Sequence, residues 1–343
     1  MQRKPGFYLA IFAFCVAVVV IVLGAYTRLV HAGLGCPDWP TCYSHFWVPT
    51  TPEEIHHANQ NFSATPVQTD KTWPEQIHRI FASSLGVLVI GLLVIAIRNR
   101  KTKNQPLKLP AFMLGFVILQ GLFGMWTVTL LLWPQVVTAD LLGGFTTLSL
   151  LCLLAQRLGG FVWMLKKEAW QKVVRLRGLA LAGLLAVVMQ IALGGWTTSN
   201  YAALACPDLP TCHGKWLPAM DFSAGFNVFQ HIGPNYLGGQ LDNAARTAIH
   251  FAHRVGAVVV TLLLLSLIVA LWRTGIRECR RMSVVVSLVL LVQLTLGISN
   301  VVFGLPLFVA VSHNAVGALL LLIMVTLNHR VLTVQCHSSI EEK

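Results

Sequence analysis

The sequence has few charged side chains for its length. Asp, Glu, Lys and Arg make up 11% of the 343 residues, and 55% of the chain is hydrophobic. A soluble globular protein carries about 25% charged residues. The composition therefore excludes an ordinary soluble domain and indicates a membrane protein, in agreement with a mean hydropathy of +0.68.

The chain contains eight apolar segments. The first lacks the small-residue cleavage site of a secretory signal and is too long for a signal's apolar region, so it is expected to remain as a helix. Every apolar segment is near the roughly 20 residues that span a bilayer. Trp73-Pro74 is expected to begin the second helix, because proline is tolerated in a first turn. The eight helices are expected near 7–27, 73–97, 109–131, 135–156, 178–198, 247–271, 283–303 and 306–327. The sequence predicts an all-α integral membrane protein.

The formal net charge of +12 does not indicate nucleic-acid binding, because lysine and arginine lie in short loops between the apolar segments. Basic loops mark the cytoplasmic side of a membrane protein. We therefore expect both termini in the cytoplasm and no nucleic-acid partner. The long loops at 28–72 and 199–246 are then expected on the outer side. The basic segments are Arg3-Lys4, Arg98–Lys103, Lys166–Arg177 and Arg273–Arg281.

One heptad occurs twice in the chain: CPDWPTC at Cys36–Cys42 returns as CPDLPTC at Cys206–Cys212. A repeat on this scale indicates a duplicated half rather than a solenoid of short units. The sequence therefore predicts two pseudo-symmetric four-helix bundles. Residues 1–156 form the N-terminal half, 157–177 a cytoplasmic linker and 178–343 the C-terminal half.

The two halves also agree outside the heptads, and where they differ we expect their tasks to differ. The matched residues, first half then second half, are Glu75 and His250, His78-Arg79 and His253-Arg254, Gln120–Gly124 and Gln293–Gly297, and Asp140 and His313.

Each cysteine pair most simply forms a disulfide within its own loop in an oxidising compartment. A structural staple is favoured for Cys206 and Cys212. Stapling and redox chemistry stay equally open for Cys36 and Cys42. A zinc site is disfavoured, because each loop lacks the second close pair of a structural zinc ligand set.

The second half contains two histidines, His253 and His313, near the outer ends of two predicted helices. Two neutral imidazoles from facing helices can ligate a six-coordinate haem iron inside a four-helix bundle. Arg254 is placed to pair with a haem propionate. The alternative is a pair of polar core histidines with backbone partners.

The first half offers a different set of groups. Glu75 and His78 are three residues apart and share a helix face, and ionisable groups beside an apolar run indicate a function unless they reach the outer interface. Asp140 must be paired, protonated or bound to a ligand. His78, beside Arg79, would give a haem one strong ligand and leave its other face weakly held or open. We therefore expect catalysis in this half and electron transfer in the other.

These motifs together resemble the haem A synthase family, and the resemblance covers nearly the whole chain. The motifs are GLGCPDWPTC, E-x-x-H-R in the second helix, a paired position in the fourth, H-R in the sixth and a histidine in the eighth. The resemblance implies a multi-pass enzyme of the bacterial inner membrane. Such enzymes oxidise a porphyrin methyl group of haem O to a formyl group, which gives haem A for cytochrome oxidase.

The resemblance also implies residue roles. Glu75 matches the family's catalytic carboxylate, which could deprotonate water or a hydroxymethyl intermediate. His78 matches a ligand of the substrate haem, and His253 and His313 match the ligands of haem B. Asp140 departs from the family, which usually has a histidine in the fourth helix. Electrons would leave through the second haem or through the first cysteine pair.

Implied partners are haem O, haem A and membrane lipid, with haem O synthase and cytochrome oxidase assembly factors as further candidates. A homo-oligomer stays open. One alternative is a membrane thiol-disulfide oxidoreductase coupled to quinone, which would also carry outer cysteine pairs. A non-catalytic b-type haem protein is another. A transporter is disfavoured, because the halves share one orientation and lack interrupted helices.

Overall fold

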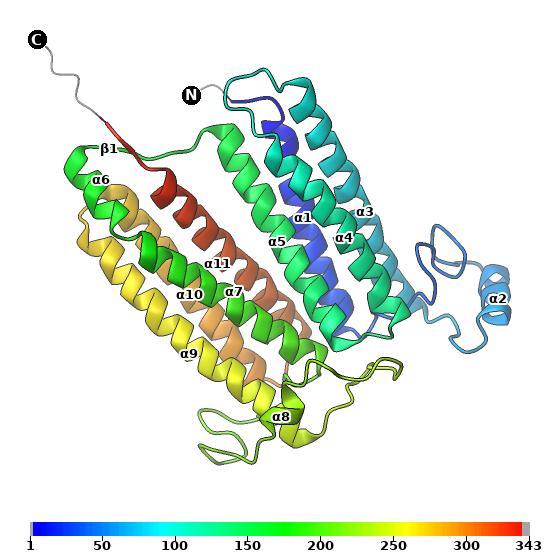
Figure 1. Ribbon diagram of the computed structural model, residues 1–343. Helices are drawn as coiled ribbons and strands as arrows, with labels where there is room; N and C mark the ends of the chain where they lie inside the picture. The colour runs from blue at the N-terminus through cyan, green and yellow to red at the C-terminus, as the bar shows by residue number, and fades with distance from the viewer. Residues whose placement is uncertain (1–2, 338–343) are drawn as a thin grey trace, which may run out of the picture.

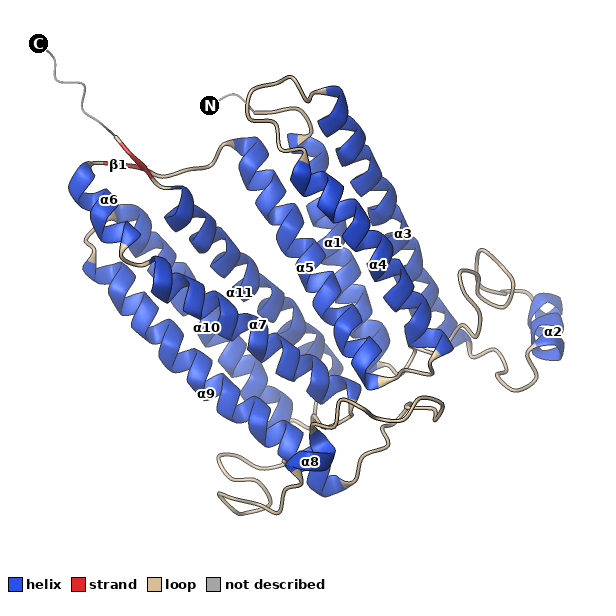
Figure 2. Ribbon diagram, in the orientation of Figure 1, coloured by secondary structure: helices blue, strands red, loops and turns tan. Residues whose placement is uncertain are grey.

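The computed structural model describes residues 3–337 and is built almost entirely of α-helices (Figures 1 and 2). The described part contains eight helical spans that are long and apolar enough to cross a membrane. Each corresponds to one predicted segment, so the prediction of an all-α integral membrane protein is confirmed. The long helices are α1 (Phe7–Leu29), α3 (Thr69–Arg98), α4 (Lys108–Thr129), α5 (Pro134–Gly159), α7 (Arg177–Ser199), α9 (Asn243–Arg273), α10 (Arg277–Val302) and α11 (Leu307–Thr333).

Short elements lie in the connections between the long helices. The long loops contain α2 (Pro52–Asn61) and α8 (Phe222–Gly225), and the linker contains α6 (Lys167–Val174). Strand β1 (Met164–Leu165) in the linker pairs in parallel with β2 (Gln335–Cys336), which follows the last long helix. The linker is therefore tied to the far end of the second half.

The long helices pack as two rings of four (Figure 1). In the first ring α1 contacts α3 and α5, and α4 closes the ring between them. In the second ring α7, α9, α10 and α11 repeat this order. Helix α5 contacts α7 and α11, and α1 contacts α11, so these helices join the two rings.

Leucines at helical spacing form the inner faces of the rings. Leu264, Leu267 and Leu271 of α9 are fully buried, because residues three and four apart lie on one side of a helix. Val258 and Leu262 of the same helix are mostly exposed. Both faces of the helix are apolar, as expected where one contacts protein and the other lipid.

The predicted start of the second helix at Trp73-Pro74 is wrong. Helix α3 begins at Thr69 and contains Pro74. The amide groups of Lys71 and Thr72 both donate to the carbonyl oxygen of Gln68, which forms the first turn upstream of the proline. Because Pro74 falls early in the helix, its missing N–H removes a single bond near the helix end.

The two long loops lie at one end of the helices, and the linker with the loop after α3 lies at the other end (Figure 1). We call these the cysteine end and the linker end. The candidate site residues lie in or near the cysteine end. Residues 1–2 and 338–343, which the predicted halves and their termini include, lie outside the described residues.

Candidate functional site

Each long loop is closed by a disulfide at its start. Cys36 is bonded to Cys42 and Cys206 to Cys212, and the Cα atoms of each pair are 4.8 Å apart. Each pair thus closes within its own loop.

An aspartate inside each heptad holds the turn together. Asp38 accepts hydrogen bonds from the hydroxyl group of Thr41 and from the backbone amides of Tyr43, at 2.6 Å, and Ser44, at 2.8 Å. Asp208 makes the corresponding three bonds in the second loop. A short side chain that accepts from successive amides stabilises a tight turn.

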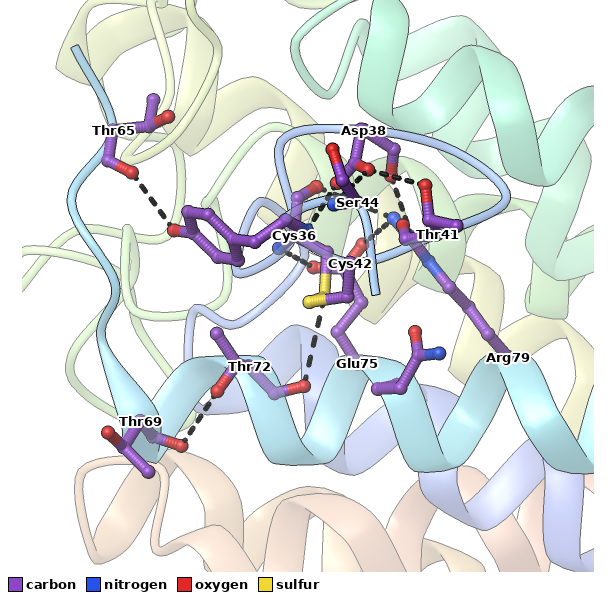
Figure 3. Close-up of a disulfide and its surroundings, with 12 residues drawn as sticks. Cys36, Asp38, Thr41, Cys42, Ser44, Thr65, Thr69, Thr72, Glu75 and Arg79 are labelled. Carbon is purple, nitrogen blue, oxygen red and sulfur yellow. Dashed lines mark hydrogen bonds and ion pairs between the residues drawn. A yellow bond between two sulfur atoms is a disulfide. The ribbon is translucent and has the colours of Figure 1, made fainter. Parts of the chain in front are cut away.

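The first loop is fastened to α3 by Glu75 and Arg79 (Figure 3). The guanidinium of Arg79 donates to the carbonyl oxygens of Asp38, at 2.8 Å, and Thr41, at 2.7 Å, and to Glu75 Oε1, at 2.5 Å. Glu75 Oε2 accepts from the amide of Cys36 at 2.9 Å. Glu75 is buried, so its carboxylate is an ion-pair partner and a loop anchor at once.

The second loop is fastened to α9 in the same way, with one chemical change. Arg254 donates to the carbonyl oxygens of Asp208 and Thr211, both at 2.9 Å, and of Cys206, at 2.7 Å. His250 Nδ1 accepts from the amide of Cys206 at 3.2 Å. A ring nitrogen thus takes the anchoring role of a carboxylate oxygen, and the second half lacks the acid at this position.

Three site histidines lie against glycines of neighbouring helices. A Cβ atom added to any of these glycines would come so close to the Cε1 atom of the facing ring that the ring would have to move by a few tenths of an ångström. The contacts are Gly24 with His78 at 3.0 Å, Gly194 with His253 at 3.3 Å, and Gly297 with His313 at 3.1 Å.

Two glutamines contact the histidines of the second half. Gln190 Nε2 lies 3.1 Å from His253 Nδ1 and donates to the His253 carbonyl oxygen at 2.9 Å. Gln293 Nε2 lies 3.4 Å from His313 Nε2. Nδ1 of His78 and Nδ1 of His313 are buried and have no hydrogen-bond partner among the described residues. These ring nitrogens therefore have unused bonding capacity.

Asp140 contacts Gln120, the counterpart of the Gln293 that contacts His313, but does not reach the matching glycine. Gln120 Nε2 donates to Asp140 Oδ1 and to its carbonyl oxygen, both at 2.6 Å. Gly124 corresponds to Gly297, yet a Cβ atom at Gly124 would meet nothing within 4 Å. The aspartate is drawn to the glutamine, and the space that a histidine ring would cover is open.

The second half fits a bis-histidine haem by its donor set. His253 and His313 come from α9 and α11 of one ring. Their imidazoles are the expected ligand type for a haem inside a helical bundle. The first half supplies His78 and, at the second ligand position, a carboxylate, so it fits a haem held more firmly on one face.

The sequence analysis missed the glycine contacts and the glutamine next to His253. One of the three glycines had a usable signal, because Gly297 ends a motif that matches Gln120–Gly124. Gly24 and Gly194 each precede the end of the first helix of their half. Their role could not be derived from the sequence, because it depends on which face of one helix meets another.

Comparisons with known proteins agree on one family. Residues 7–325 match the family model described as cytochrome oxidase assembly protein. A heme A synthase of Shewanella oneidensis is 45% identical over 91% of this chain and 92% of its own length. A heme A synthase of Caulobacter vibrioides is 28% identical over 94% of this chain and 95% of its own length. A heme A synthase of Halalkalibacterium halodurans is 27% identical over 88% of this chain and 89% of its own length.

Proposed function

The chain belongs to the cytochrome oxidase assembly protein family, and from this premise we propose that it is a haem A synthase. It oxidises a methyl group of haem O to the formyl group of haem A. The observation that carries the proposal is the 45% identity to a heme A synthase over 91% of the chain. The relatives' names favour neither a quinone-coupled thiol-disulfide oxidoreductase nor a non-catalytic haem protein.

The first half binds the substrate in this proposal. His78 ligates the iron of haem O, and the open space near Gly124 is consistent with a second face that is less firmly held. Asp140 lies at that second face. The asymmetry suits a substrate site, because the product must be able to leave the first half. The corresponding site of the second half holds a permanent cofactor in this proposal.

Glu75 is the proposed catalytic base. A carboxylate offers about four acceptor positions, and the Cys36 amide and Arg79 use only part of them. The remaining lone pairs can accept a proton from water or from the hydroxymethyl intermediate. The position of Arg79 keeps the carboxylate fixed relative to His78, which lies one turn away on α3.

The second half holds haem B in this proposal, with His253 and His313 as ligands. Bound there, haem B would supply a one-electron carrier. Gln190 keeps the His253 ring in one orientation through its two contacts.

Arg79 and Arg254 are the proposed propionate partners. Most of their N–H groups are used by the carbonyl oxygens of the heptads. A guanidinium has five N–H donors. Arg79 makes four contacts, the fourth to the Cys36 carbonyl oxygen, and Arg254 also makes four, the fourth to His250 Nε2, so one donor on each remains. Cys36 and Cys42 keep two proposed roles, as a loop staple and as an electron route.

We propose the bacterial inner membrane as the location, with the cysteine end outside and the linker end in the cytoplasm. Cys336 is exposed, and it lies in β2, which pairs with β1 of the linker. In intact spheroplasts a membrane-impermeant maleimide should leave Cys336 unlabelled, and in inverted vesicles it should label it. The opposite pattern would reverse the orientation. Interaction with haem O synthase or with assembly factors stays a prediction, as does a homo-oligomer.

The function is tested by haem extraction from cells that supply haem O. Cells that make haem O but lack their own haem A synthase should form haem A when they express this chain. The purified protein should show a low-spin b-type spectrum that His253→Ala removes. Accumulated haem O without haem A, in cells that contain the folded protein, would contradict the assignment.

A further inference from the structure

A pocket lies at the linker end, far from the cysteine loops. Its volume is about 700 Å³. Its walls come from both halves, because Lys4 and Asn104 belong to the first, Gln156 and Arg157 to the end of α5, and His329 to the end of α11. The haem ligands described above take no part in it.

The pocket is positively charged. Lys4 and Arg157 line it, and among the described residues that line it there is no Asp or Glu. Arg330 lies beside the pocket, with its guanidinium 5.3 Å from the centre of the Phe161 ring, which forms part of the wall. Cations from three separate segments thus surround one space.

Two buried side chains in this wall have unused hydrogen-bonding atoms. His329 and Gln156 are each 7% exposed. His329 Nδ1 and Gln156 Oε1 have no hydrogen-bond partner among the described residues, although Gln156 Nε2 donates to the Thr326 hydroxyl group at 3.2 Å. A buried polar atom without a partner is costly. A ligand in the pocket would supply both partners.

The charge bias of the membrane side does not explain this arrangement. Basic residues gather in cytoplasmic loops for topological reasons, and Arg175 is an example, since it is exposed and outside the pocket. Topology requires neither a cavity between the halves nor an imidazole and an amide buried in its wall.

We propose that this pocket binds a phosphate-bearing anion. Lys4 and Arg157 pair with the phosphate oxygens, His329 donates or accepts according to its tautomer, and Gln156 Oε1 accepts from a hydroxyl group of the ligand. Several oxygens on one phosphorus suit donors that converge from several segments. The source is an anionic phospholipid headgroup or a soluble phosphate, and basic pockets between membrane helices are known to take the former.

The test uses full-length protein that has been depleted of lipid in detergent. Binding is measured by native mass spectrometry and by the shift of the thermal unfolding midpoint. The probes are phosphatidylglycerol, phosphatidylcholine and inorganic phosphate. Arg157→Gln is compared with Arg175→Gln, which removes an equal charge from the same end outside the pocket.

Phosphatidylglycerol or inorganic phosphate should bind the unaltered protein, and Arg157→Gln should weaken that binding roughly five- to tenfold. Arg175→Gln should leave it unchanged. Preference for phosphatidylglycerol over inorganic phosphate identifies a lipid site, and the reverse identifies a soluble ligand. Equal losses in both variants, or equal binding of phosphatidylcholine, would overturn the proposal, because only diffuse charge or the acyl chains would then be recognised.

His329→Gln provides a second measurement. The variant keeps a polar group but moves its donor and acceptor atoms, so it should weaken binding of the preferred probe. An unfolding midpoint equal to that of the parent protein without probe would show that the variant folds. Unchanged binding in this folded variant would contradict the role given to the buried imidazole and, with it, the proposal.

Discussion

At the scale of single residues, position 140 separates the chemistry of the two halves. Asp140→His should increase haem affinity in the first half by roughly tenfold or more, because even about 1.4 kcal/mol from a second imidazole ligand changes affinity tenfold. The ring would have free space over Gly124, as the His313 ring has its place over Gly297. Haem stoichiometry and the spin state of the first-half haem measure the effect. Identical values in both proteins would show that residue 140 does not face the iron.

Glu75 is both a loop anchor and the proposed catalytic base, whereas its counterpart His250 is only a loop anchor. Variants of the two residues therefore separate these roles. Glu75→Gln should lower haem A formation roughly 100-fold or more, the usual loss when a general base is removed, while haem binding persists. His250→Gln alters the matching anchor of the other loop and should retain turnover within about tenfold. An equally large loss in His250→Gln would mean that anchoring a loop, and not proton transfer, explains the requirement for Glu75.

The glycines beneath the histidines offer a paired experiment. Gly297→Ala places a Cβ atom 3.1 Å from the His313 ring, so the ring must shift and haem B affinity should fall about tenfold. Gly124→Ala is the matched control, because its Cβ atom meets no protein atom within 4 Å. The low-spin haem signal of the second half reports Gly297→Ala, and the haem stoichiometry of the first half reports Gly124→Ala. A signal that stays unchanged in Gly297→Ala would remove the proposed role of this contact.

At this scale the sequence predicted the titratable site residues but not what holds them. His253 and His313 could be singled out because a polar residue in an apolar helix is rare and the repeat aligns both. Gln190 is also a polar residue inside an apolar helix, but an amide is not a haem ligand and does not indicate which residue it contacts. Its contact with His253 exists only once α7 and α9 pack together.

At the scale of elements, the cysteine loops depend on buried and charged anchors. Hydrogen bonds from the Thr211 hydroxyl group and from the amides of Gly214 and His213 lower the pKa of Asp208 from 3.8 to about 2. A carboxylate with a lowered pKa in the folded loop stabilises that loop fully above about pH 4. The contribution is lost as the pH falls towards the folded pKa.

Asp208→Asn should therefore make the second loop more susceptible to protease at neutral pH. The parent protein should approach the variant's cleavage rate only when the pH falls from about 4 towards 2. An acid-stable protease with one pH series for each protein measures this. A parent rate that already rises between pH 7 and 5 would point to another titrating group.

The start of α5 was predicted closely, at residue 135, because Pro134 marks it, whereas its end was predicted at residue 156 and lies at Gly159. The start of α3 was predicted late, because a proline that suits a first turn is also tolerated shortly after one. In the basic linker the short helix α6 has an amphipathic pattern, whereas the two-residue strand β1 has no pattern that marks it. Their positions depend on the end of the chain with which they pack.

At the scale of the whole molecule, Arg28 joins the two halves at the cysteine end. From the end of α1 it donates to the Tyr201 hydroxyl group at 2.5 Å and to the Thr198 carbonyl oxygen at 2.8 Å. Its guanidinium also lies 4.1 Å from the centre of the Tyr201 ring. The ring of His31 stacks with that of Tyr201. The sequence pointed to Arg28 only as a helix exit, because its partners belong to the other half.

Arg28→Leu should lower the stability of the protein by roughly 2 kcal/mol, since hydrogen bonds to a charged group contribute about 1.5–3 kcal/mol. It should also lower haem A formation, because electrons must cross between halves that this residue helps to hold together at the cysteine end. The haem B spectrum should not change, as Arg28 is remote from His253 and His313 in sequence and lies in the other ring.

Tyr201→Phe is the graded control, because it keeps the ring and loses one hydrogen bond, so its effects should be smaller. Thermal unfolding, extracted haem A and the absorption spectrum are measured on the same preparations. If Arg28→Leu unfolds earlier but forms haem A at the parent rate, Arg28 stabilises the contact between the halves without setting the path of the electrons.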